Sequence, residues 1–386
     1  MDNKIKPVKA GISRQRKLEF FHHKSVREWG GKDQVDSFAV LHPARRTHKH
    51  GLYIVLHSAG HDLYSCLGCT FMPDNHDIYR TPDNLFGLYL DCRENQSEDF
   101  WWGGINAKGE GNPERKNVRQ PVENRVYATI EWVMKQYPID ENRVYICGNS
   151  MGGSGALGLG MCRGDLFAAV KVNVPAGVQH MLDRINMEKE TLPDPPICID
   201  YSAPDDAWSE GHADFYKFMR EKRFSLFGYW APFGHANSDT LMLEKNDLIH
   251  SFDWLSVRKN QAYPVFTNAA SDNKNPWENP ETAATPGQVN AFFRWKNVSD
   301  SPNRFSMMIY IDAAINTRVQ IPTQTIADVT LRRIQEFHLS PGETIAWTFG
   351  TQNGISTADT HGILTLPKLV ITDSSQKLTL RRTSKK

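Results

Sequence analysis

A serine flanked by two glycines is the feature of this sequence best suited to chemistry. Gly148, Ser150 and Gly152 form a Gly-x-Ser-x-Gly pattern, preceded by the apolar run 143–147 and followed by the small-residue run 153–159. This order predicts a buried strand, a tight turn and a helix. Such a turn crowds the backbone around the serine, and glycine relieves the crowding because it has no Cβ. The pattern therefore predicts Ser150 as a nucleophile held at the end of a strand.

A serine that attacks a carbonyl needs backbone N–H groups to hold the negative charge that develops on the oxygen. The residue after the nucleophile supplies one of them, and here that residue is Met151, at the amino end of the expected helix. A second is expected in a turn after an early strand. The continuously apolar run 52–56 leads into such a turn of small residues. We predict Ala59 as the second donor, with Ser58 as the alternative.

An acid and then a histidine are expected after the serine in chain order. The apolar strand 197–202 runs into Asp205 and Asp206, from where a carboxylate can hold an imidazole in its working tautomer. Both aspartates qualify. We favour Asp205 because it lies nearest the expected distance past the strand end, which leaves Asp206 to solvent or to a helix cap. His235 follows the next apolar strand, 224–230, in a Gly-His loop, and we predict it as the base.

Four tryptophans near these loops are candidates for contacting a substrate. Trp101 and Trp102 follow the expected strand 85–90, at the carboxyl end of the sheet, where open α/β sheets form their active sites. Trp208 follows the acid loop, and Trp230 precedes the histidine loop. We predict that these rings line the substrate pocket and stack on a sugar or phenolic ring. The alternative is that they pack the loops.

The region around the serine resembles a known group of enzymes. The run 143–153, led in by residues 137–142, is similar to the nucleophile region of α/β-hydrolase esterases. The nearest look-alikes are the feruloyl/acetyl esterases and the polyhydroxybutyrate-depolymerase-like esterases. That resemblance implies an acyl-enzyme, no metal and no other cofactor, and a triad of Ser150, Asp205 and His235.

The resemblance covers roughly residues 35–258 and departs from the group's pattern at two turns. The turn after the early strand and the end of the acid strand usually read His-Gly. Here they read His57-Ser58 and Tyr201-Ser202. These differences leave the triad in place and bear on the oxyanion geometry and the choice of substrate.

The distribution of strands, helices and turns predicts three parts of the chain. Residues 1–34 form an N-terminal extension. Strands and helices alternate over residues 35–260, which indicates an α/β-hydrolase domain with a mainly parallel central sheet. Short strand-like runs separated by turns fill residues 261–386 and predict an all-β, sandwich-like domain. This C-terminal domain is expected either to bind sugar or only to brace the catalytic domain.

The cysteines do not form a recognisable metal site. Cys66 and Cys69 are spaced as a redox or metal pair, but no second pair or suitably spaced histidines complete a zinc site. Cys147 and Cys198 fall in expected core strands and are predicted to be buried thiols. A disulfide involving Cys66, Cys69 or Cys92 is left open.

Composition excludes several classes of partner. The formal net charge is +1, which gives no electrostatic case for binding nucleic acid or an anionic membrane. No apolar run reaches membrane-spanning length, and the polar, basic residues 1–16 have no apolar h-region, so no signal peptide is expected within them. The one partner that the sequence indicates is an ester substrate, and the oligomeric state is open.

These features together predict a serine carboxylic ester hydrolase that deacylates plant polysaccharide at feruloyl or acetyl esters. Such a substrate indicates a secreted or periplasmic protein, with a cytoplasmic one as the alternative. Two other functions are kept: a serine peptidase of the prolyl-oligopeptidase type, and a non-catalytic carbohydrate-binding protein on a hydrolase scaffold.

Overall fold

The computed structural model describes residues 6–13, 15–24, 35–45, 48–72, 77–92, 100–102, 119–186, 194–235 and 247–382. The chain divides into two compact units. The first consists of Met1–Phe215, Phe233–Asp239 and Leu255–Lys259, and the second of Tyr216–Pro232, Thr240–Trp254 and Asn260–Lys386. The domain boundaries that the sequence predicts, after residues 34 and 260, stay predictions.

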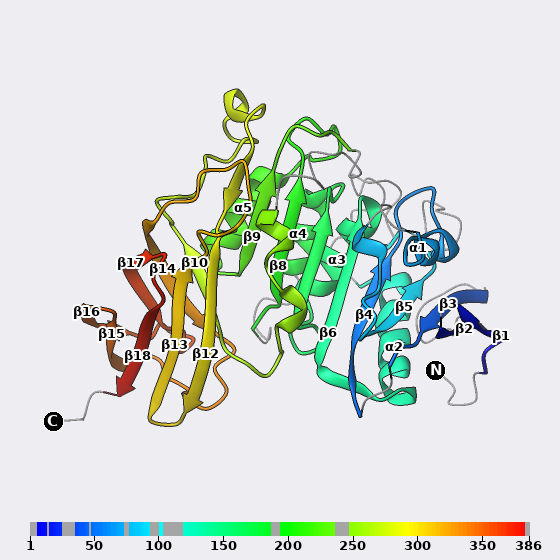
Figure 1. Ribbon diagram of the computed structural model, residues 1–386, viewed down its shortest axis with the longest axis horizontal. Coiled ribbons are helices and arrows are strands. Elements are labelled where there is room, and N and C mark those ends of the chain that lie inside the picture. The colour runs from blue at the N-terminus through cyan, green and yellow to red at the C-terminus, as the bar shows by residue number, and fades with distance from the viewer. Residues whose placement is uncertain are drawn as a thin grey trace. The chain divides into compact units, whose positions relative to one another are not determined.

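A mainly parallel sheet forms the centre of the first unit (Figure 1). Its strands are β1 (Lys9–Ser13), β2 (Arg16–Lys24), β3 (Val35–Leu41), β4 (His50–Leu56), β5 (Phe86–Leu90), β6 (Ile139–Asn149), β7 (Ala169–Asn173) and β8 (Ile197–Ser202). They lie in the order β1-β2-β3-β5-β4-β6-β7-β8. The first three pair antiparallel, and β3 is antiparallel to β5. All pairs from β5 to β8 are parallel. This sheet confirms the predicted α/β-hydrolase fold.

Burial explains why the central strands are apolar. All seven residues of β4 are buried, as are all five of β7. A parallel strand with helices on both faces has no solvent-facing side, so it reads as a continuous apolar run rather than an alternating one. The sequence therefore locates these strands well but cannot say which side chain faces which layer.

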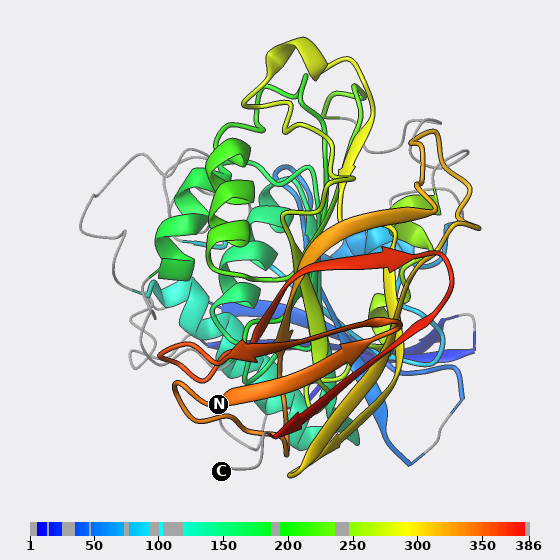
Figure 2. The same ribbon diagram turned by 90° about the vertical axis from the view of Figure 1, so that its left-hand side faces the viewer.

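Helices connect the parallel strands of the first unit. They are α1 (Leu63–Cys69), the 3₁₀ turn η2 (Asp77–Tyr79), α2 (Pro121–Gln136), α3 (Met151–Met161) and α4 (Val178–Asn186). The next helix, α5 (His212–Glu221), begins in the first unit and ends in the second. In α2, the buried residues Val126, Ile130 and Val133 recur at helical spacing and form its inner face. Helix α3 packs on β6, β7 and α4, and Figure 2 shows the cyan and green helices of the first unit beside one another. None of the described helices is both long and apolar enough to cross a membrane.

The second unit is built mostly from antiparallel strands and confirms the predicted all-β C-terminal region. One sheet has the order β10-β14-β17 and another β12-β13-β18-β15-β16, while β9 pairs with β11. Strand β17 packs against β13 and β16 of the larger sheet. The strands are β9 (Leu226–Trp230), β10 (Tyr263–Thr267), β11 (Gly287–Val289), β12 (Phe293–Ser301), β13 (Arg304–Ile311), β14 (Gln324–Arg332), β15 (Thr344–Phe349), β16 (Gln352–Thr357), β17 (Thr365–Thr372) and β18 (Gln376–Arg382).

Residues 336–339, one of the short strand-like runs of the C-terminal region, do not form a strand. The carboxylate of Asp300 accepts hydrogen bonds from the backbone N–H groups of Gln335, Glu336 and Phe337 at 2.6, 3.3 and 2.8 Å. Those donors would otherwise pair with a neighbouring strand. A side chain distant in sequence therefore takes the place of a ladder partner.

All six cysteines are buried free thiols. Burial raises the pKa of Cys147 to about 12 and also raises the pKa of Cys66. The thiolate is the reactive form of cysteine, so these side chains act as small apolar residues rather than as nucleophiles.

Candidate active site

Ser150 lies in a sharp turn between the end of β6 and the start of α3. Its backbone has φ 55° and ψ −121°, a conformation that side-chain-bearing residues rarely adopt. The backbone N–H of Ser150 donates to the carbonyl of Asn173 at the end of β7, at 2.9 Å, which holds the turn in place.

Only glycine fits on either side of this serine. A Cβ on Gly148 would collide with the backbone of Gly152, and a Cβ on Gly152 would collide with the carbonyl of Leu56 in β4. The two glycines therefore let the chain reverse tightly and let the start of α3 approach the end of β4. This is the strand, turn and helix that the Gly-x-Ser-x-Gly pattern predicts.

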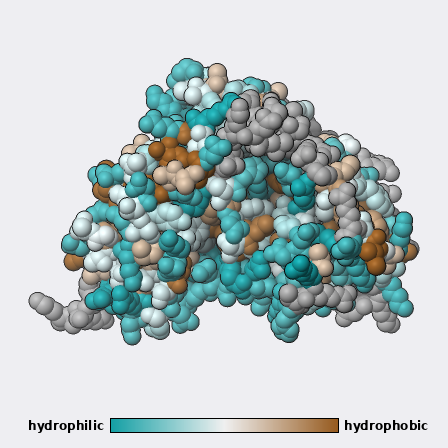
Figure 3. All heavy atoms as spheres, in the orientation of Figure 1, coloured by the Kyte–Doolittle hydropathy of each residue, from teal (hydrophilic) through white to brown (hydrophobic). Residues whose placement is uncertain are grey.

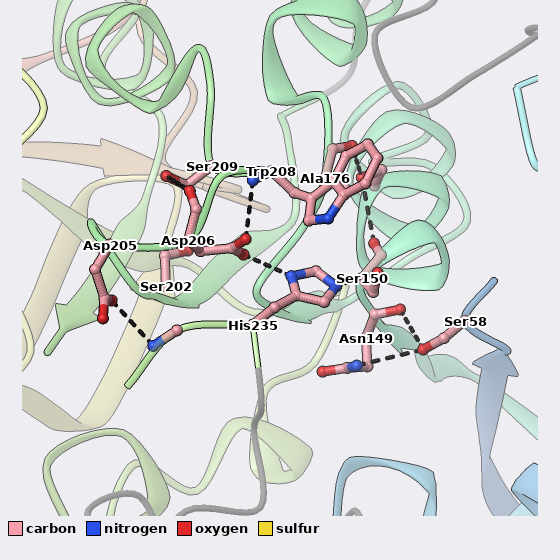
Figure 4. A network of polar contacts seen from close by, with 12 residues as sticks. Ser58, Asn149, Ser150, Ala176, Ser202, Asp205, Asp206, Trp208, Ser209 and His235 are labelled. Atoms are coloured by element: carbon pink, nitrogen blue, oxygen red, sulfur yellow. Dashed lines mark hydrogen bonds and ion pairs between the residues drawn. The ribbon is translucent and has the colours of Figure 1, made fainter. Parts of the chain in front are cut away.

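A chain of two hydrogen bonds leads away from the serine. The Oγ of Ser150 lies 2.7 Å from Nε2 of His235, and Nδ1 of His235 lies 2.6 Å from Oδ2 of Asp206 (Figure 4). With its proton on Nδ1, His235 donates to the carboxylate and leaves Nε2 free to accept the serine proton. The side chain of Asp206 is 1% exposed, whereas that of His235 is 37% exposed. The arrangement joins a partly accessible base to a buried acid.

The structure corrects the preference for Asp205. Asp205 is exposed, and its Oδ1 accepts a hydrogen bond from the backbone N–H of Gly234 at 3.0 Å. The chain turns at this point, since the N–H of Asp206 donates to the carbonyl of Ala203 at 3.1 Å. Adjacent side chains in a turn diverge, so counting residues past the strand end does not decide which one points inward. Asp205 holds the histidine loop by its backbone, and Asp206 faces the imidazole.

A second set of buried polar groups fixes the loop that carries Asp206. The carbonyl of Asp206 accepts hydrogen bonds from the backbone N–H and the hydroxyl of Ser209, at 3.0 and 2.8 Å. The carbonyl of Ser209 in turn contacts Nδ1 of His212 at 2.7 Å. Nε2 of His212 lies 2.8 Å from the hydroxyl of Ser202, which donates to Asp200 at 2.8 Å.

The residues Asp200, Ser202 and His212 form what we call the buried relay, and none of the three is exposed. Burial lowers the pKa of His212, an effect that Asp200 partly offsets. The buried relay has the residue types of a catalytic triad, but no substrate can reach it. The role of His212 in holding the Asp206 loop cannot be predicted from the sequence, because this histidine lies within a helix and belongs to no motif.

The two predicted oxyanion donors lie at the ends of neighbouring parallel strands. Met151 is the first residue of α3, and Ala59 lies in the exposed turn after β4. In the part of the chain that the structure describes, neither backbone N–H has a recorded hydrogen-bond partner. Both groups are thus available to an incoming oxygen, and their role stays a prediction.

Ser58, the alternative donor, ties the two strand ends together. Its hydroxyl donates to the carbonyl of Asn149 at 2.8 Å and contacts the hydroxyl of Tyr79 (Figure 4). His57 holds the same turn from inside, because its Nε2 accepts from the N–H of Cys92 at 2.9 Å and its Nδ1 contacts the carbonyl of Ser58 at 2.8 Å. Serine in place of the usual glycine therefore adds a hydrogen bond between the two strand ends beside the nucleophile.

Three of the four predicted substrate-lining tryptophans are buried, which corrects that prediction. Trp101 donates its indole N–H to the carbonyl of His57 at 2.9 Å, and its ring covers Gly155 of α3. Trp102 is 1% exposed. In the second unit, Trp230 is also 1% exposed. A large aromatic ring stabilises the fold most when it is removed from water, so the packing alternative holds at these positions.

Trp208 is the exception. Its side chain is 48% exposed, and it is the one tryptophan among the exposed large hydrophobic residues of the described ranges. Its ring centroid lies 6.5 Å from that of His235, and Figure 4 shows the indole beside Ser150 and His235. The backbone is held at both ends, by the contact of its N–H with Asp206 at 2.8 Å and of its carbonyl with the N–H of Gly177 at 3.2 Å.

An exposed indole is unusual on this molecule. In the space-filling view the visible face is mainly hydrophilic, with hydrophobic residues confined to small patches (Figure 3). Single exposed apolar residues are common on proteins, but one held beside a hydrogen-bonded serine and histidine has a surface to offer a ligand. Trp208 therefore stays a candidate for substrate contact.

Comparison with known proteins agrees with this site. Residues 91–214 match the family model named Esterase, described as "Putative esterase". The matched segment includes Ser150 and Asp206 and ends before His235. No curated protein sequence matches the chain.

Several solved structures of esterases and hydrolases are similar at a distance. An S-formylglutathione hydrolase from Agrobacterium tumefaciens matches with 14% identity and a TM-score of 0.45, over 61% of this chain and 95% of that one. The S-formylglutathione hydrolase of Staphylococcus aureus matches with 13% identity and a TM-score of 0.42, over 62% and 98%. A ferulic acid esterase from Anaeromyces mucronatus matches with 14% identity and a TM-score of 0.40, over 61% and 92%. Identities and TM-scores as low as these do not assign a function, and the function proposed below rests on the strand order and the geometry of the site.

Proposed function

We propose that this chain is a serine carboxylic ester hydrolase that removes feruloyl or acetyl groups from plant polysaccharide. The observation that carries the proposal is the hydrogen-bonded series from Ser150 through His235 to Asp206, with the serine in a strained turn at the start of a helix. The match of residues 91–214 to an esterase family supports ester hydrolysis over other acyl transfers.

The geometry suits a two-step reaction through an acyl-enzyme. Ser150 Oγ attacks the ester carbonyl while His235 Nε2 accepts its proton, and the imidazolium that forms is stabilised by the Asp206 carboxylate. The N–H groups of Met151 and Ala59 receive the developing oxyanion. His235 then protonates the departing alcohol and afterwards activates the water that releases the acid.

The exposed ring of Trp208 supports an aromatic or sugar group on the substrate side. An indole face beside the base can stack on a feruloyl ring or on the apolar face of a sugar. A polysaccharide substrate lies outside the cytoplasm, so a secreted or periplasmic location is part of the proposal.

The test uses wild-type protein and Ser150→Ala side by side on four esters: a chromogenic acetyl ester, a chromogenic butyryl ester, methyl ferulate and acetylated xylan. The proposal expects serine-dependent release from methyl ferulate or acetylated xylan. A fluorophosphonate probe should label the wild type and leave Ser150→Ala unlabelled. Labelling without release from any ester, or cleavage of proline-containing peptides instead, would overturn the substrate assignment. Full activity in Ser150→Ala would overturn the mechanism.

A further inference from the structure

A cavity of about 290 Å³ lies within the second unit. It is lined by the last turns of α5, by the facing ends of β9, β10 and β11, and by the loop 268–279. We call it the C-terminal cavity. None of its lining residues belongs to the candidate active site. Its size is near the lower end of the range for small-molecule pockets, which starts at about 300 Å³.

The floor of the C-terminal cavity is built by hydrogen bonds that do not depend on a ligand. Gln288 and Asn273 are joined twice, by the Gln288 N–H to Asn273 Oδ1 and by the Asn273 N–H to the Gln288 carbonyl, both at 3.0 Å. Asn290 donates from Nδ2 to the carbonyls of Leu226 and Phe266 at 3.1 and 3.0 Å. Asn290 is 4% exposed and has φ 56°, a left-handed conformation that asparagine tolerates. The cavity is therefore preformed.

Several polar groups around the cavity keep unused hydrogen-bonding capacity. Oδ1 of Asp272 accepts from the Asn290 N–H at 2.9 Å, which leaves Oδ2. Oδ1 of Asn275 accepts from the Trp277 N–H at 3.1 Å, which leaves Nδ2. Nδ2 of Asn279 donates to the Asn275 carbonyl at 3.1 Å, which leaves Oδ1. Within the described part of the chain, these remaining atoms and Oδ1 of the buried Asn290 form no hydrogen bond with the protein.

The remaining groups are a mixture of donors and acceptors, and this mixture narrows the ligand class. A hydroxyl group donates one hydrogen bond and accepts others, so a polyol can satisfy amide N–H groups and carboxylate oxygens at the same time. An apolar ligand would leave them unpaired, at a cost of about 1–3 kcal/mol for each buried group. The lining also includes the apolar side chains of Phe224 and Phe266, and Phe266 is itself stacked on Phe293 at 4.2 Å between ring centroids.

Charge argues against a simple anion. Lys217, Arg220 and Lys274 line the cavity, but all three are exposed, and solvent and salt screen their attraction. The carboxylate of Glu278 lies on the same lining and offsets part of that attraction, and Asp272 adds to the repulsion of a carboxylate or a phosphate only where it is ionised. A neutral ligand meets neither difficulty.

We propose that the C-terminal cavity binds a single neutral sugar residue, with its hydroxyl groups on Asp272, Asn275 and Asn279 and its ring carbons toward Phe224 and Phe266. This site does not depend on the esterase activity, because it shares no residue with Ser150, Asp206 or His235. It gives the second unit a binding role of its own.

The test is saturation-transfer NMR on full-length Ser150→Ala, which cannot turn over an ester. The probes are D-xylose, L-arabinose and D-glucose, with acetate and inorganic phosphate as anions. We expect at least one sugar to bind saturably, and the double variant Asn275→Ala/Asn279→Ala to weaken that binding at least about tenfold, as the loss of two hydrogen bonds implies. Asn353→Ala, an exposed position on β16 of the same unit outside the cavity, serves as the matched control and should leave binding unchanged.

Three outcomes would overturn the proposal: no binding of any sugar, sugar binding that the double variant leaves intact, or saturable anion binding that the double variant removes. Val289→Met, which puts a longer side chain at a lining position, answers the same question if the asparagine variants fail to fold. Sugar binding by a protein that hydrolyses no ester would refute only the proposed activity. Ester hydrolysis without sugar binding would refute only the sugar-binding role of the C-terminal cavity.

Discussion

Asp205 and Asp206 are neighbours in the chain, yet only Asp206 points at His235 (Figure 4). A buried carboxylate 2.6 Å from Nδ1 fixes both the ring orientation and the tautomer of the histidine. The exposed Asp205 contacts only the backbone of the same loop. The two aspartates have the same side chain and neighbouring positions in the chain. A comparison of variants at the two positions therefore tests the effect of side-chain direction alone.

We predict that Asp206→Asn lowers kcat on an ester by about 10³- to 10⁴-fold with little change in KM, because an amide can hold the imidazole in the wrong tautomer. Asp205→Asn keeps its hydrogen bond to Gly234 and should retain kcat within about threefold, since a surface hydrogen bond of this kind is worth roughly 0.5–1.5 kcal/mol at most. Steady-state kinetics on both variants checks this. Equal losses in the two would contradict the assignment of Asp206.

A second prediction concerns Trp208. In the proposed site the exposed ring of Trp208 contacts the substrate away from the reacting atoms, so we expect Trp208→Ala to raise KM for an aromatic or sugar ester about 3- to 10-fold at similar kcat. Trp208→Phe keeps an aromatic face, so its KM should lie between those of the wild type and of Trp208→Ala. An unchanged KM across the ester panel would show that the ring makes no contact with substrate.

The start of α3 packs closely against the end of β4, and this contact helps to form the site. Gly152 has the carbonyls of Leu56 and His57 in the space where a Cβ would lie, and these backbone atoms cannot move aside. The same approach brings the turn with Ala59 toward the start of α3 with Met151. Gly152 would therefore support the predicted oxyanion donors as well as the turn.

Gly152→Ala should therefore cost about 1–3 kcal/mol of unfolding free energy, the range for overpacking a rigid site, and lower kcat strongly. Gly68→Ala is the matched control: its Cβ would meet only the flexible end of Met72, and alanine is favoured over glycine within a helix by about 0.5–1 kcal/mol. Urea unfolding of both variants gives the comparison. A neutral Gly152→Ala would mean that β4 and α3 can separate.

The sequence carries some of these elements better than others. Ser150 and His235 can be predicted because each lies at a strand end that an apolar run marks. The choice between Asp205 and Asp206 cannot, because a turn of the backbone decides it. The burial of Trp101 cannot be predicted either, since the hydrogen bond from its indole to His57 joins residues 44 positions apart. Strand β16, Gln352–Thr357, is polar and has only one buried residue, so it contains no apolar run from which it could be predicted.

The loop under the C-terminal cavity makes stability depend on pH. Burial raises the pKa of Asp272 to about 7, an effect that the Asn290 N–H and Arg220 partly offset. The folded protein thus keeps a proton that the unfolded chain, with the ordinary value of 3.8, has released. The stabilisation is complete below the unfolded pKa and is lost as pH rises through the folded one.

We expect wild-type unfolding free energy to fall more steeply between pH 5 and pH 8 than that of Asp272→Asn, which has no proton to lose. The amide can still accept from the Asn290 N–H, so the loop should keep its shape. Urea unfolding of both proteins across this range measures the difference. Parallel pH curves would contradict the shifted pKa.

At the scale of the whole molecule, the two units are interleaved along the chain. Residues 216–232 and 240–254 belong to the second unit although they precede residue 260. Within that unit, Phe227 and Phe252 stack on each other at 4.5 Å, and Trp295 of β12 lies 5.5 Å from Phe252. Strand β9 pairs with β11. The second unit is therefore completed by segments from before and after the apparent boundary.

A fragment of residues 1–260 should consequently be unstable. It keeps Phe227, Phe252 and Trp230 but loses the partners that cover them, which removes on the order of several kcal/mol of aromatic burial. We expect the fragment to bind a hydrophobic dye and to melt well below the full-length chain. A fragment with the full-length melting temperature and unaltered solubility would contradict this.

The interleaving also bears on how such a protein can change by recombination. A single crossover near residue 260 would give a descendant or an engineered chimera one parent's Phe227 and Phe252 with the other parent's Trp295. These three rings pack together, and rings from different parents would not be matched in size and position. A new C-terminal module can be grafted successfully only if residues 216–232 and 240–254 are inherited with it, so these two segments and the C-terminal region form one heritable cassette in three pieces.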